Sequence, residues 1–328
     1  MTAPPVVREG LVAEARRSIA RGSKSFAAAS RLFDRETRER VWLLYAWCRA
    51  CDDIADGQDH GYALSDEGDA ERRLASIRML TAQALSGKLT GSPAFDALFI
   101  LAQETGITQD MADDVVAGFA LDAEGWRPRS EADMLRYCYH VAGAVGTMMA
   151  VVMGVDPSDE DTMARACDLG IAFQLGNIAR DVLEDDAADR RYLPVEWIVE
   201  ADVPMGEITK PHYREALVGV VARLLALQER YEASARVGAA RLSFRQRWAI
   251  LAATGIYGAI GREVARRGAH AWDRRVHTSR WQKAGHVAGA FWAAWRKPKH
   301  AGSPEWSRAE LRELAAGKSL SPRGERMA

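Results

Sequence analysis

The sequence predicts an all-α protein, and three observations indicate it. Ala, Leu, Arg and Glu dominate the composition, and apolar residues recur at the spacing of helix faces along most of the chain. No stretch alternates apolar and polar residues over the length that a half-buried strand requires. None of the loops is long or low in complexity, so we expect one large helical domain rather than two domains joined by a linker.

The predicted helices are separated by loops that carry Gly and Pro. Three helix starts are marked by side chains that cap a first turn. Asp34 stands before the second segment, Ser130 with Asp133 three residues later begins the sixth, and Ser158 precedes the acidic first turn of the seventh. In chain order, the predicted helices lie near residues 8–29, 35–57, 68–87, 93–105, 108–123, 131–155, 160–187, 213–241, 244–268, 276–296 and 304–317.

Composition and charge exclude several classes of function. Apolar residues make up 48% of the chain, which argues against intrinsic disorder. Lys and Arg number 44 against 45 Asp and Glu, so no overall positive charge favours nucleic-acid binding. Four cysteines are too few for a disulfide scaffold, and residues 1–10 lack the apolar core of a secretory signal. We therefore expect a cytoplasmic protein with no nucleic-acid partner.

The best candidate for a membrane span is the nineteen-residue stretch from Tyr137 to Val155, which contains no Asp, Glu, Lys or Arg. It is borderline in length for a span, and it contains His140 and three glycines. We predict a buried central helix there. An integral membrane protein that uses this stretch as a span is the alternative.

The C-terminal part of the chain differs from the rest. Residues 262–299 contain ten basic side chains against two acidic ones. A basic helix with interfacial aromatics is typical of a segment that lies on an anionic membrane surface, and the alternative is a peripheral helix that packs its tryptophans onto the bundle. We expect residues 1–275 to form the helical domain and residues 276–328 a basic, Trp-containing helical extension. Three tryptophans fall at helical spacing in this extension: Trp281, Trp292 and Trp295.

Two otherwise apolar predicted helices each carry two aspartates one helical turn apart. Asp52 and Asp56 follow an apolar run in one helix, and Asp181 and Asp185 follow another. Side chains at positions i and i+4 share a helix face, so each pair can bind one cation from two sides. An apolar setting makes an uncompensated carboxylate costly, and a hard divalent cation would compensate it. Asn177 stands one turn before Asp181 and extends the second pair into a row of oxygen ligands.

The residue types indicate which metal such a site would take. Oxygen ligands without His or thiolate favour Mg²⁺ or Mn²⁺. No histidine has Asp or Glu three residues before it, which excludes a ferritin-like di-iron site, and Cys48 and Cys51 lack the further ligands of a zinc site. One alternative stays open, because Arg49 and Arg180 stand beside the aspartates and would neutralise them as buried ion pairs.

The same two arginines also fit a phosphate ligand. Carboxylates bind Mg²⁺, Mg²⁺ binds phosphate oxygens, and Arg side chains bind the remaining oxygens. Near the N-terminus, Ser23, Lys24 and Ser25 add one cation and two hydroxyls. This segment lacks the full pattern of a P-loop, so the sequence predicts a phosphate or diphosphate ligand rather than a P-loop NTPase.

Aromatic side chains suit the species that forms when diphosphate leaves an allylic carbon. The carbocation survives only where water is excluded and ring faces stabilise it. Ordinary core packing is the alternative for each ring. The aromatic candidates are Phe26, Tyr45, Tyr137, Phe173 and Tyr257. Four small residues would let an apolar chain approach the backbone, or would instead let helices pack closely: Ala142, Gly143, Ala144 and Gly146.

Four blocks of the sequence closely resemble the squalene/phytoene synthase family, and they occur in the family's order. The similarity runs from about residue 15 to 270, so the tail beyond about residue 275 lies outside it. Gly176 stands where the family pattern leads us to expect Thr, a change that affects local packing and removes no proposed ligand. The blocks are Arg21–Phe26, Leu44–Asp56, Tyr137–Gly146 and Phe173–Asp185.

The resemblance implies a fold and an activity. The fold is an all-α, single-domain isoprenoid-synthase helical bundle with a central apolar cavity. The activity is that of a transferase, a prenyltransferase of carotenoid biosynthesis, which condenses two geranylgeranyl diphosphates head to head, through prephytoene diphosphate, to phytoene without a reductant. The cofactor is Mg²⁺ (or Mn²⁺), and the two acidic helix faces are expected to confront each other across the cavity.

The resemblance also implies roles for single residues. Metal binding falls to Asp52, Asp56, Asn177, Asp181 and Asp185. Contact with substrate falls to Ser23, Lys24, Ser25, Tyr45, Arg49, Gln174, Arg180 and Tyr257. The residues that we expect to carry catalysis are Asp52, Asp56, Asp181, Asp185, Tyr45 and Tyr137.

Two alternatives share this fold. The first keeps the mechanism and uses the shorter farnesyl diphosphate to make squalene or dehydrosqualene. The second is a non-catalytic assembly protein, which could lose its metal ligands without penalty, although both aspartate pairs and Asn177 are present. The inner face of the membrane is a second expected location, with the protein bound peripherally.

Overall fold

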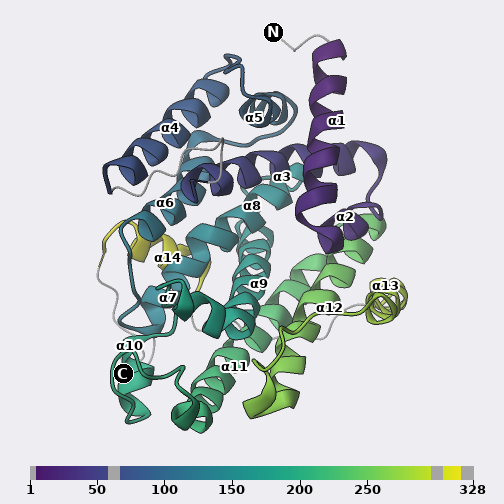
Figure 1. The fold of residues 1–328 in the computed structure, drawn as a ribbon. Helices are drawn as coiled ribbons and strands as arrows, with labels where there is room; N and C mark the ends of the chain where they lie inside the picture. The colour runs from purple at the N-terminus through teal and green to yellow at the C-terminus, as the bar shows by residue number, and fades with distance from the viewer. Residues whose placement is uncertain (1–4, 58–66, 297–305, 319–328) are drawn as a thin grey trace. The chain divides into compact units, whose positions relative to one another are not determined.

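The structure is a computed structural model that describes residues 5–57, 67–296 and 306–318, and it is built from helices (Figure 1). No strand occurs among these residues, which confirms the all-α prediction. The described chain divides into two compact units. One contains Met1–Glu124 and Thr147–Met163, and the other contains Gly125–Gly146 and Ala164–Ala328. Both C-terminal helices fall in the second unit, and the proposed division at residue 275 stays a prediction.

In the first unit, α3 is the helix against which α1, α4 and α5 pack. Its apolar face is buried at Leu43, Leu44 and Trp47, and the Trp47 indole Nε1 donates a hydrogen bond to Thr81 Oγ1 at 3.3 Å. The helix begins where the Asp34 carboxylate accepts from the backbone N–H of Thr37, as the sequence predicts. The helices of this unit are α1 (Pro5–Gly22), α2 (Lys24–Ser30), α3 (Arg35–Ala55), α4 (Glu67–Leu85), α5 (Pro93–Glu104), α6 (Gln109–Ala123) and most of α8 (Ala144–Val152).

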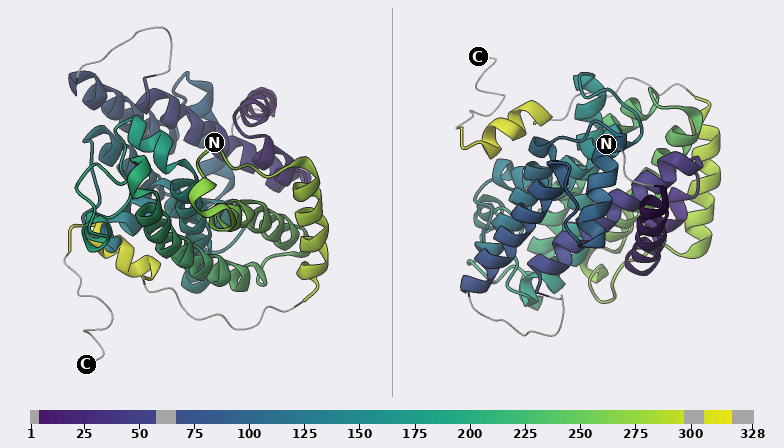
Figure 2. Two further views of the ribbon diagram at one scale, coloured as in Figure 1. Left: turned by 60° about the horizontal axis from the view of Figure 1, so that its bottom comes forward. Right: turned by 90° about the horizontal axis from the view of Figure 1, so that it is seen from above.

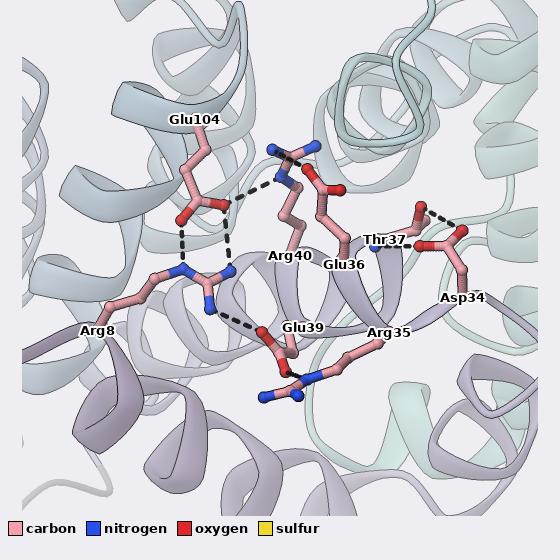
Figure 3. A network of polar contacts seen from close by, with 8 residues as sticks. All are labelled: Arg8, Asp34, Arg35, Glu36, Thr37, Glu39, Arg40 and Glu104. Carbon is pink, nitrogen blue, oxygen red and sulfur yellow. Dashed lines mark hydrogen bonds and ion pairs between the residues drawn. The ribbon is translucent and has the colours of Figure 1, made fainter. Parts of the chain in front are cut away.

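A network of ionised side chains ties α1, α3 and α5 together (Figure 3). Arg8 of α1 binds Glu39 of α3 through Nη1 and Oε2 at 2.7 Å, and it also binds Glu104 of α5. Arg40 of α3 reaches the same Glu104 through Nε and Oε2 at 3.0 Å. Each of the two glutamates therefore receives more than one guanidinium, since Arg35 also binds Glu39 at 2.8 Å.

The predicted helix over residues 8–29 is wrong as a single element, because the chain breaks at Ser23. Ser23 has extended backbone angles, and its hydroxyl accepts a hydrogen bond from the backbone N–H of Phe26 at 3.3 Å. The hydroxyl thus caps a second helix, α2, which begins at Lys24. The side chains of Lys24 and Ser25 lie outside the described part of the structure.

The second unit contains the longest helix and the C-terminal helices. Ile171, Leu175, Leu217, Leu224 and Tyr231 are fully buried in its core. Sequence periodicity misses the six-residue α10, which is too short to show a helical pattern. The elements of this unit are α7 (Glu131–Cys138), the π-helix η1 (Tyr139–Gly143), most of α9 (Glu160–Ala187), α10 (Val195–Glu200), the 3₁₀-helix η2 (Pro211–Tyr213), α11 (Arg214–Ala239), α12 (Phe244–Arg267), the 3₁₀-helix η3 (Gly268–His270), α13 (Arg280–Ala294) and α14 (Arg308–Ala315).

The predicted helix over residues 131–155 is interrupted by the π-helical segment η1. Glycines bring this segment very close to α9: a Cβ added to Gly146 would lie 2.3 Å from the carbonyl oxygen of Ala166, and one added to Gly170 would lie 2.1 Å from that of Ala142. These glycines therefore serve close helix packing, which is the alternative considered for the small residues. Among the described helices, none combines the length and the hydropathy needed to cross a membrane.

The helix starts can be compared one by one with the sequence. Ser130 and Asp133 form the predicted capping box at the start of α7. Ser158 does not cap α9, because Asp159 takes that role: its carboxylate accepts from the backbone N–H of Thr162 at 3.1 Å and from the Thr162 hydroxyl at 2.6 Å. The predicted start of the last helix, at residue 304, lies outside the described residues.

Candidate active site

The predicted row of oxygen ligands lies on α9. This helix is continuous from Glu160 to Ala187, so Asn177, Asp181 and Asp185 stand one turn apart on one side of it. All three side chains are half-buried, while Ile171, Leu175 and Ile178 of the same helix are buried in the core. Apolar residues are buried around much of the helix, and the acidic row lies beside buried side chains such as Ile178 and Val182.

Two arginines bind Asp181. The Arg180 guanidinium donates to the Asp181 carboxylate through both Nε, at 2.7 Å, and Nη2. Arg275 donates to the same carboxylate at 3.0 Å and forms an ion pair with Glu184 at 3.1 Å. Arg180 was predicted from the sequence, whereas Arg275 lies 94 residues away along the chain and its role is visible only in the structure.

Asp185 is the carboxylate that is least well neutralised. Burial raises its pKa to about 7, and the negative charge of Asp181 adds to the shift. Arg190 and Arg180 oppose this shift without cancelling it. A divalent cation beside Asp181 and Asp185 would restore the ionised form, so the donor set of α9 fits a hard metal ion.

No cluster of three or more His, Cys, Asp or Glu side chains suited to a metal occurs in the described parts of the chain. This agrees with the usual coordination of Mg²⁺ in proteins. The ion binds one or two carboxylates, and water and substrate phosphates supply its other ligands. The acidic row of α9 is therefore suited to a metal that arrives with a diphosphate.

A pocket opens beside Asp185 within the second unit. The space enclosed inside it is about 40 Å³. Apolar side chains such as Ile178, Val182 and Ile198 line it together with the arginines Arg127, Arg190 and Arg191. An apolar wall with cations beside an acid suits a ligand that has an apolar chain and an anionic head.

A second acid on α9, Asp186, anchors the loop after the helix. Its carboxylate accepts from Arg191 Nε at 2.7 Å and from Thr209 Oγ1 at 2.5 Å, and these contacts lower its pKa although burial opposes the shift. Asp186, Arg191 and Thr209 cannot be recognised from the sequence, because their spacing matches no motif.

The first aspartate pair lies at the end of α3, in the other unit. Asp52 is half-buried and binds Arg49 at 2.8 Å, and Asp53 binds the second Nη atom of the same guanidinium. Asp56 is exposed and is the C-cap residue of α3. Its backbone N–H donates a hydrogen bond to the carbonyl oxygen of Asp52. The arginine pairing considered as an alternative is present in both acidic segments, at Arg49 and at Arg180.

The residues predicted to contact substrate near α3 are close to one another. Tyr45 stacks obliquely on Phe26, with ring centroids 5.9 Å apart. A Cβ added to Gly22 would lie 2.1 Å from the Tyr45 hydroxyl, so only glycine lets the phenol reach the end of α1. Ser23 therefore stands beside Tyr45 and Phe26 in this unit.

In the second unit, the predicted residues fall into two groups. Phe173 and Tyr257 stack with centroids 4.4 Å apart, and Gln174 of α9 accepts a hydrogen bond from the Asn177 amide at 3.4 Å. Tyr137, predicted to be catalytic, is buried in a stack between Trp126 and Tyr192, with centroid distances of 5.9 and 4.7 Å. Of the three stacked rings, Tyr192 lines the pocket beside Asp185.

Comparison with known proteins places the chain in a family. A family model described as squalene/phytoene synthase matches residues 19–282 of the chain. The chain belongs to the squalene/phytoene synthase family. This family match ends inside α13, so most of that helix and all of α14 lie beyond it.

Several relatives in this family are bacterial proteins. The chain is 47% identical over 285 residues to a phytoene synthase of Pseudescherichia vulneris, covering 86% of this chain and 90% of that one. It is 46% identical over 260 residues to a 15-cis-phytoene synthase of Enterobacter agglomerans, covering 79% and 87%. A 15-cis-phytoene synthase of Paracoccus is 40% identical over 307 residues, covering 89% and 99%.

Solved structures of the squalene/phytoene synthase fold agree with the described helices. A dehydrosqualene synthase crystal structure matches with a TM-score of 0.77 at 24% identity, covering 86% of this chain and 96% of that one. A squalene synthase of Alicyclobacillus acidocaldarius matches with a TM-score of 0.71 at 20% identity, covering 81% and 97%. At this identity, the likeness confirms the predicted isoprenoid-synthase helical fold.

Proposed function

We propose that the protein is a phytoene synthase, which joins two geranylgeranyl diphosphates head to head and releases two diphosphates. The observation that carries the proposal is identity of 40–47% with bacterial phytoene synthases over most of the chain. The predicted acidic segments, the arginines beside them and the stacked aromatic rings are present in the chain and supply the chemistry that this reaction needs.

Two sets of residues are proposed to hold metal ions: Asp52 and Asp56 at the C-terminal end of α3, and Asn177, Asp181 and Asp185 on α9. Bound Mg²⁺ would neutralise the negative charge that develops on the leaving diphosphate. The raised pKa of Asp185 supports this assignment, since a carboxyl held near neutrality gains most from a nearby cation. Mn²⁺ has the same preference for oxygen ligands and is the alternative metal.

Arginines and polar side chains are proposed to position the diphosphates. Arg49 and Arg180 present guanidinium groups beside the proposed ligands and can bind phosphate oxygens in a bidentate way. Ser23, Lys24 and Ser25, at the start of α2, would add hydroxyls and a cation. In the second unit, Gln174 lies next to Asn177, where it can orient the ligand row.

The aromatic rings are proposed to protect the allylic cation. When the first C–O bond breaks, the electron pair leaves with the diphosphate, and the allylic cation alkylates a double bond of the second substrate. Loss of a proton then closes the cyclopropane ring of prephytoene diphosphate. A second ionisation, a rearrangement and loss of a proton then give phytoene. Tyr45, Tyr257 and their stacking partners supply ring faces that stabilise positive charge and exclude water.

Product analysis with the purified protein tests the proposal. The protein is incubated with Mg²⁺ and either geranylgeranyl diphosphate or farnesyl diphosphate, and the lipid extract is separated by mass. We expect a C40 hydrocarbon from the longer substrate, and no product when EDTA replaces Mg²⁺. A C30 hydrocarbon without a C40 product would overturn the choice of substrate, and the absence of both would overturn the enzyme assignment.

We further propose that the protein works bound peripherally at the inner face of the membrane. The proposed substrate carries a long apolar chain and the product is a hydrocarbon, so both partition into a bilayer. Release of the protein from cell membranes by salt or alkaline washing is the expected result. Retention after both washes would contradict a peripheral location.

A further inference from the structure

The helix α13 is firmly attached to its unit by one side. Phe291 inserts between Phe244 and Trp248 of α12, with centroid distances of 5.6 and 5.2 Å. The Trp248 indole donates to the carbonyl of Val287 at 2.8 Å, and Arg247 donates to the carbonyl of Ala294 at 2.9 Å. The inner side of α13 is thus packed and hydrogen-bonded, and Figure 2 shows α13, in yellow-green, as an outer helix of its unit.

Tryptophans are exposed on the solvent side of α13, although the ring of Trp295 also packs on Phe244 of α12, with centroids 4.9 Å apart. Trp281 is 88% exposed, and Trp292 and Trp295 are each 68% exposed, which contradicts the alternative that all the tryptophans pack onto the bundle. The spacing of 281, 285, 288, 292 and 295 places these rings along one stripe with Gly285 and Ala288 between them. We name this stripe, Trp281, Gly285, Ala288, Trp292 and Trp295, the tryptophan face.

The charges around the tryptophan face have one sign. From Arg280 to Lys299 the sequence holds five Lys and Arg side chains and no Asp or Glu. Arg280 and Arg296 are exposed at the two ends of the stripe, and Lys283 is half-exposed on the turn beside Arg280. The partner of this face must therefore accept apolar rings in its interior and present negative charge at its surface.

We propose that the tryptophan face of α13 binds an anionic phospholipid bilayer, with the indoles inserted at the level of the headgroups. Tryptophan prefers this interface because the ring is apolar and its N–H still finds a hydrogen-bond acceptor there. The flanking arginines then lie among lipid phosphates. The proposal deepens the proposed function and rests on it for its purpose, because it names the surface that holds the enzyme next to its lipid substrate and product.

A second copy of the chain fits this face less well than a bilayer. Two copies that met through the tryptophan face would bring two sets of basic side chains together, and α13 itself offers no carboxylate to pair with them; like charges across an interface oppose association. The fifteen residues of α13 are also about 22 Å long at a rise of about 1.5 Å per residue, so the helix lies along the bilayer surface and does not cross it.

Vesicle binding tests the tryptophan face. The whole protein is mixed with vesicles of phosphatidylglycerol and phosphatidylcholine, or of phosphatidylcholine alone, and the bound fraction is measured by sedimentation. We expect binding to the anionic vesicles, weakened by 1 M salt, and a loss of about tenfold or more in the partition coefficient of the double variant Trp281→Ser/Trp292→Ser. The matched control is Met79→Ser/Leu89→Ser, which removes two exposed apolar side chains from the other unit and should bind as the wild type does.

Turnover in detergent micelles separates this proposal from the proposed function. A tryptophan double variant that keeps turnover in micelles and loses vesicle binding supports the tryptophan face. Wild-type protein that fails to bind anionic vesicles, or a double variant that binds as tightly as the wild type, overturns it. A dimer that dissociates in the double variant without any vesicle binding assigns the face to a second copy and also overturns it. Vesicle binding with no phytoene formation would instead refute the proposed function alone.

Discussion

Arginine and carboxylate side chains meet in two regions of this molecule, and the two clusters leave their acids in opposite states. In the first unit, burial alone would raise the pKa values of Glu39 and Glu104, yet hydrogen bonds from Arg35, Arg8 and Arg40 hold both below the usual value (Figure 3). On α9, burial and Asp181 together raise the pKa of Asp185 to about 7.

The difference separates structural acids from acids that can take a ligand. The network of Glu39 and Glu104 already holds its counter-charges, since arginines from α1 and α3 donate to it in fixed directions. Asp185 keeps a carboxyl group whose ionised form would be stabilised by one more cation. The α9 acids are therefore expected to serve the reaction, and the α1–α3–α5 network is expected to serve stability alone.

The largest expected effect follows from removing a proposed metal ligand. Asp181→Ala should lower the turnover of geranylgeranyl diphosphate by about a thousandfold or more, because the developing charge on the leaving diphosphate loses its metal. Product formation measures this effect. A second readout is the midpoint of thermal unfolding, which Mg²⁺ with pyrophosphate should raise in the wild type and raise much less in the variant.

Asp110→Ala is the matched control for this prediction. Asp110 and Asp114 have the same i, i+4 spacing on α6, but Asp110 is exposed in the first turn of its helix. We expect its replacement to leave turnover unchanged. If Asp181→Ala keeps turnover within a few-fold of the wild type, the proposed metal role of α9 is refuted.

The next effect concerns stability rather than turnover. Glu104→Ala should lower the free energy of unfolding by about 2 kcal/mol, because Arg8 and Arg40 lose a shared, largely buried partner. Denaturant unfolding measures the loss, and kcat should stay that of the wild type. In the same network Glu36 is 67% exposed and pairs only across one turn with Arg40, so Glu36→Ala should cost less than about 0.5 kcal/mol. If Glu104→Ala instead lowered kcat and left the free energy of unfolding unchanged, the network would not be purely structural, and its contrast with the α9 acids would be refuted.

The pH dependence of stability sharpens the same comparison. Because the pKa values of Glu39 and Glu104 are lowered on folding, their contribution is complete above the ordinary value of 4.5 and is lost as the pH falls through the lowered values. Between pH 5 and pH 3, the wild type should therefore lose about 1 kcal/mol more stability than Glu104→Gln does. If the free energy of unfolding changed with pH in the same way in both proteins, a lowered pKa of Glu104 would be contradicted. Urea unfolding at stepped pH values provides the measurement.

Sequence patterns predicted what depends on local order. Helical periodicity and the caps at Asp34 and Ser130 located α3 and α7, and the i, i+4 aspartates on apolar helices indicated the acidic row of α9 before any contact was known. The residue spacing predicted only a phosphate or diphosphate ligand. The resemblance to the squalene/phytoene synthase family was needed to predict a prenyl diphosphate.

Long-range contacts and breaks in helices could not be predicted in this way. Arg275 meets Asp181 across 94 positions, and no local pattern marks that pairing. The break at Ser23 arises because its hydroxyl replaces a helix hydrogen bond, against the apolar periodicity of the segment. The π-helix at Tyr139 lies where that periodicity continues, so no local pattern marks it either. The short α10 lacks the length that periodicity requires.

The smallest expected effect tests the packing side of α9, opposite to its acidic row. Gly176 stands where the resemblance leads us to expect Thr, and a Cβ there would lie 2.8 Å from the amide nitrogen of the buried Gln228. A Cβ on Gly261 of α12 would meet the same side chain at 2.1 Å, so Gln228 fills the space that two glycines leave. Gly176→Thr should therefore cost about 1 kcal/mol of unfolding free energy, since the amide has little room to move.

A double-mutant cycle with Gln228→Ala decides whether this contact is the cause. If the threonine clashes with the glutamine amide, the alanine relieves the clash. The double variant should then lose about 0.5–1 kcal/mol less unfolding free energy than the two single variants lose together. Additive costs would place the strain elsewhere. Turnover should be unchanged in all three variants, because the substituted side chains face the packed side of α9 and leave Asn177, Asp181 and Asp185 in place; a loss of kcat in Gly176→Thr would mean that packing and chemistry on this helix are coupled.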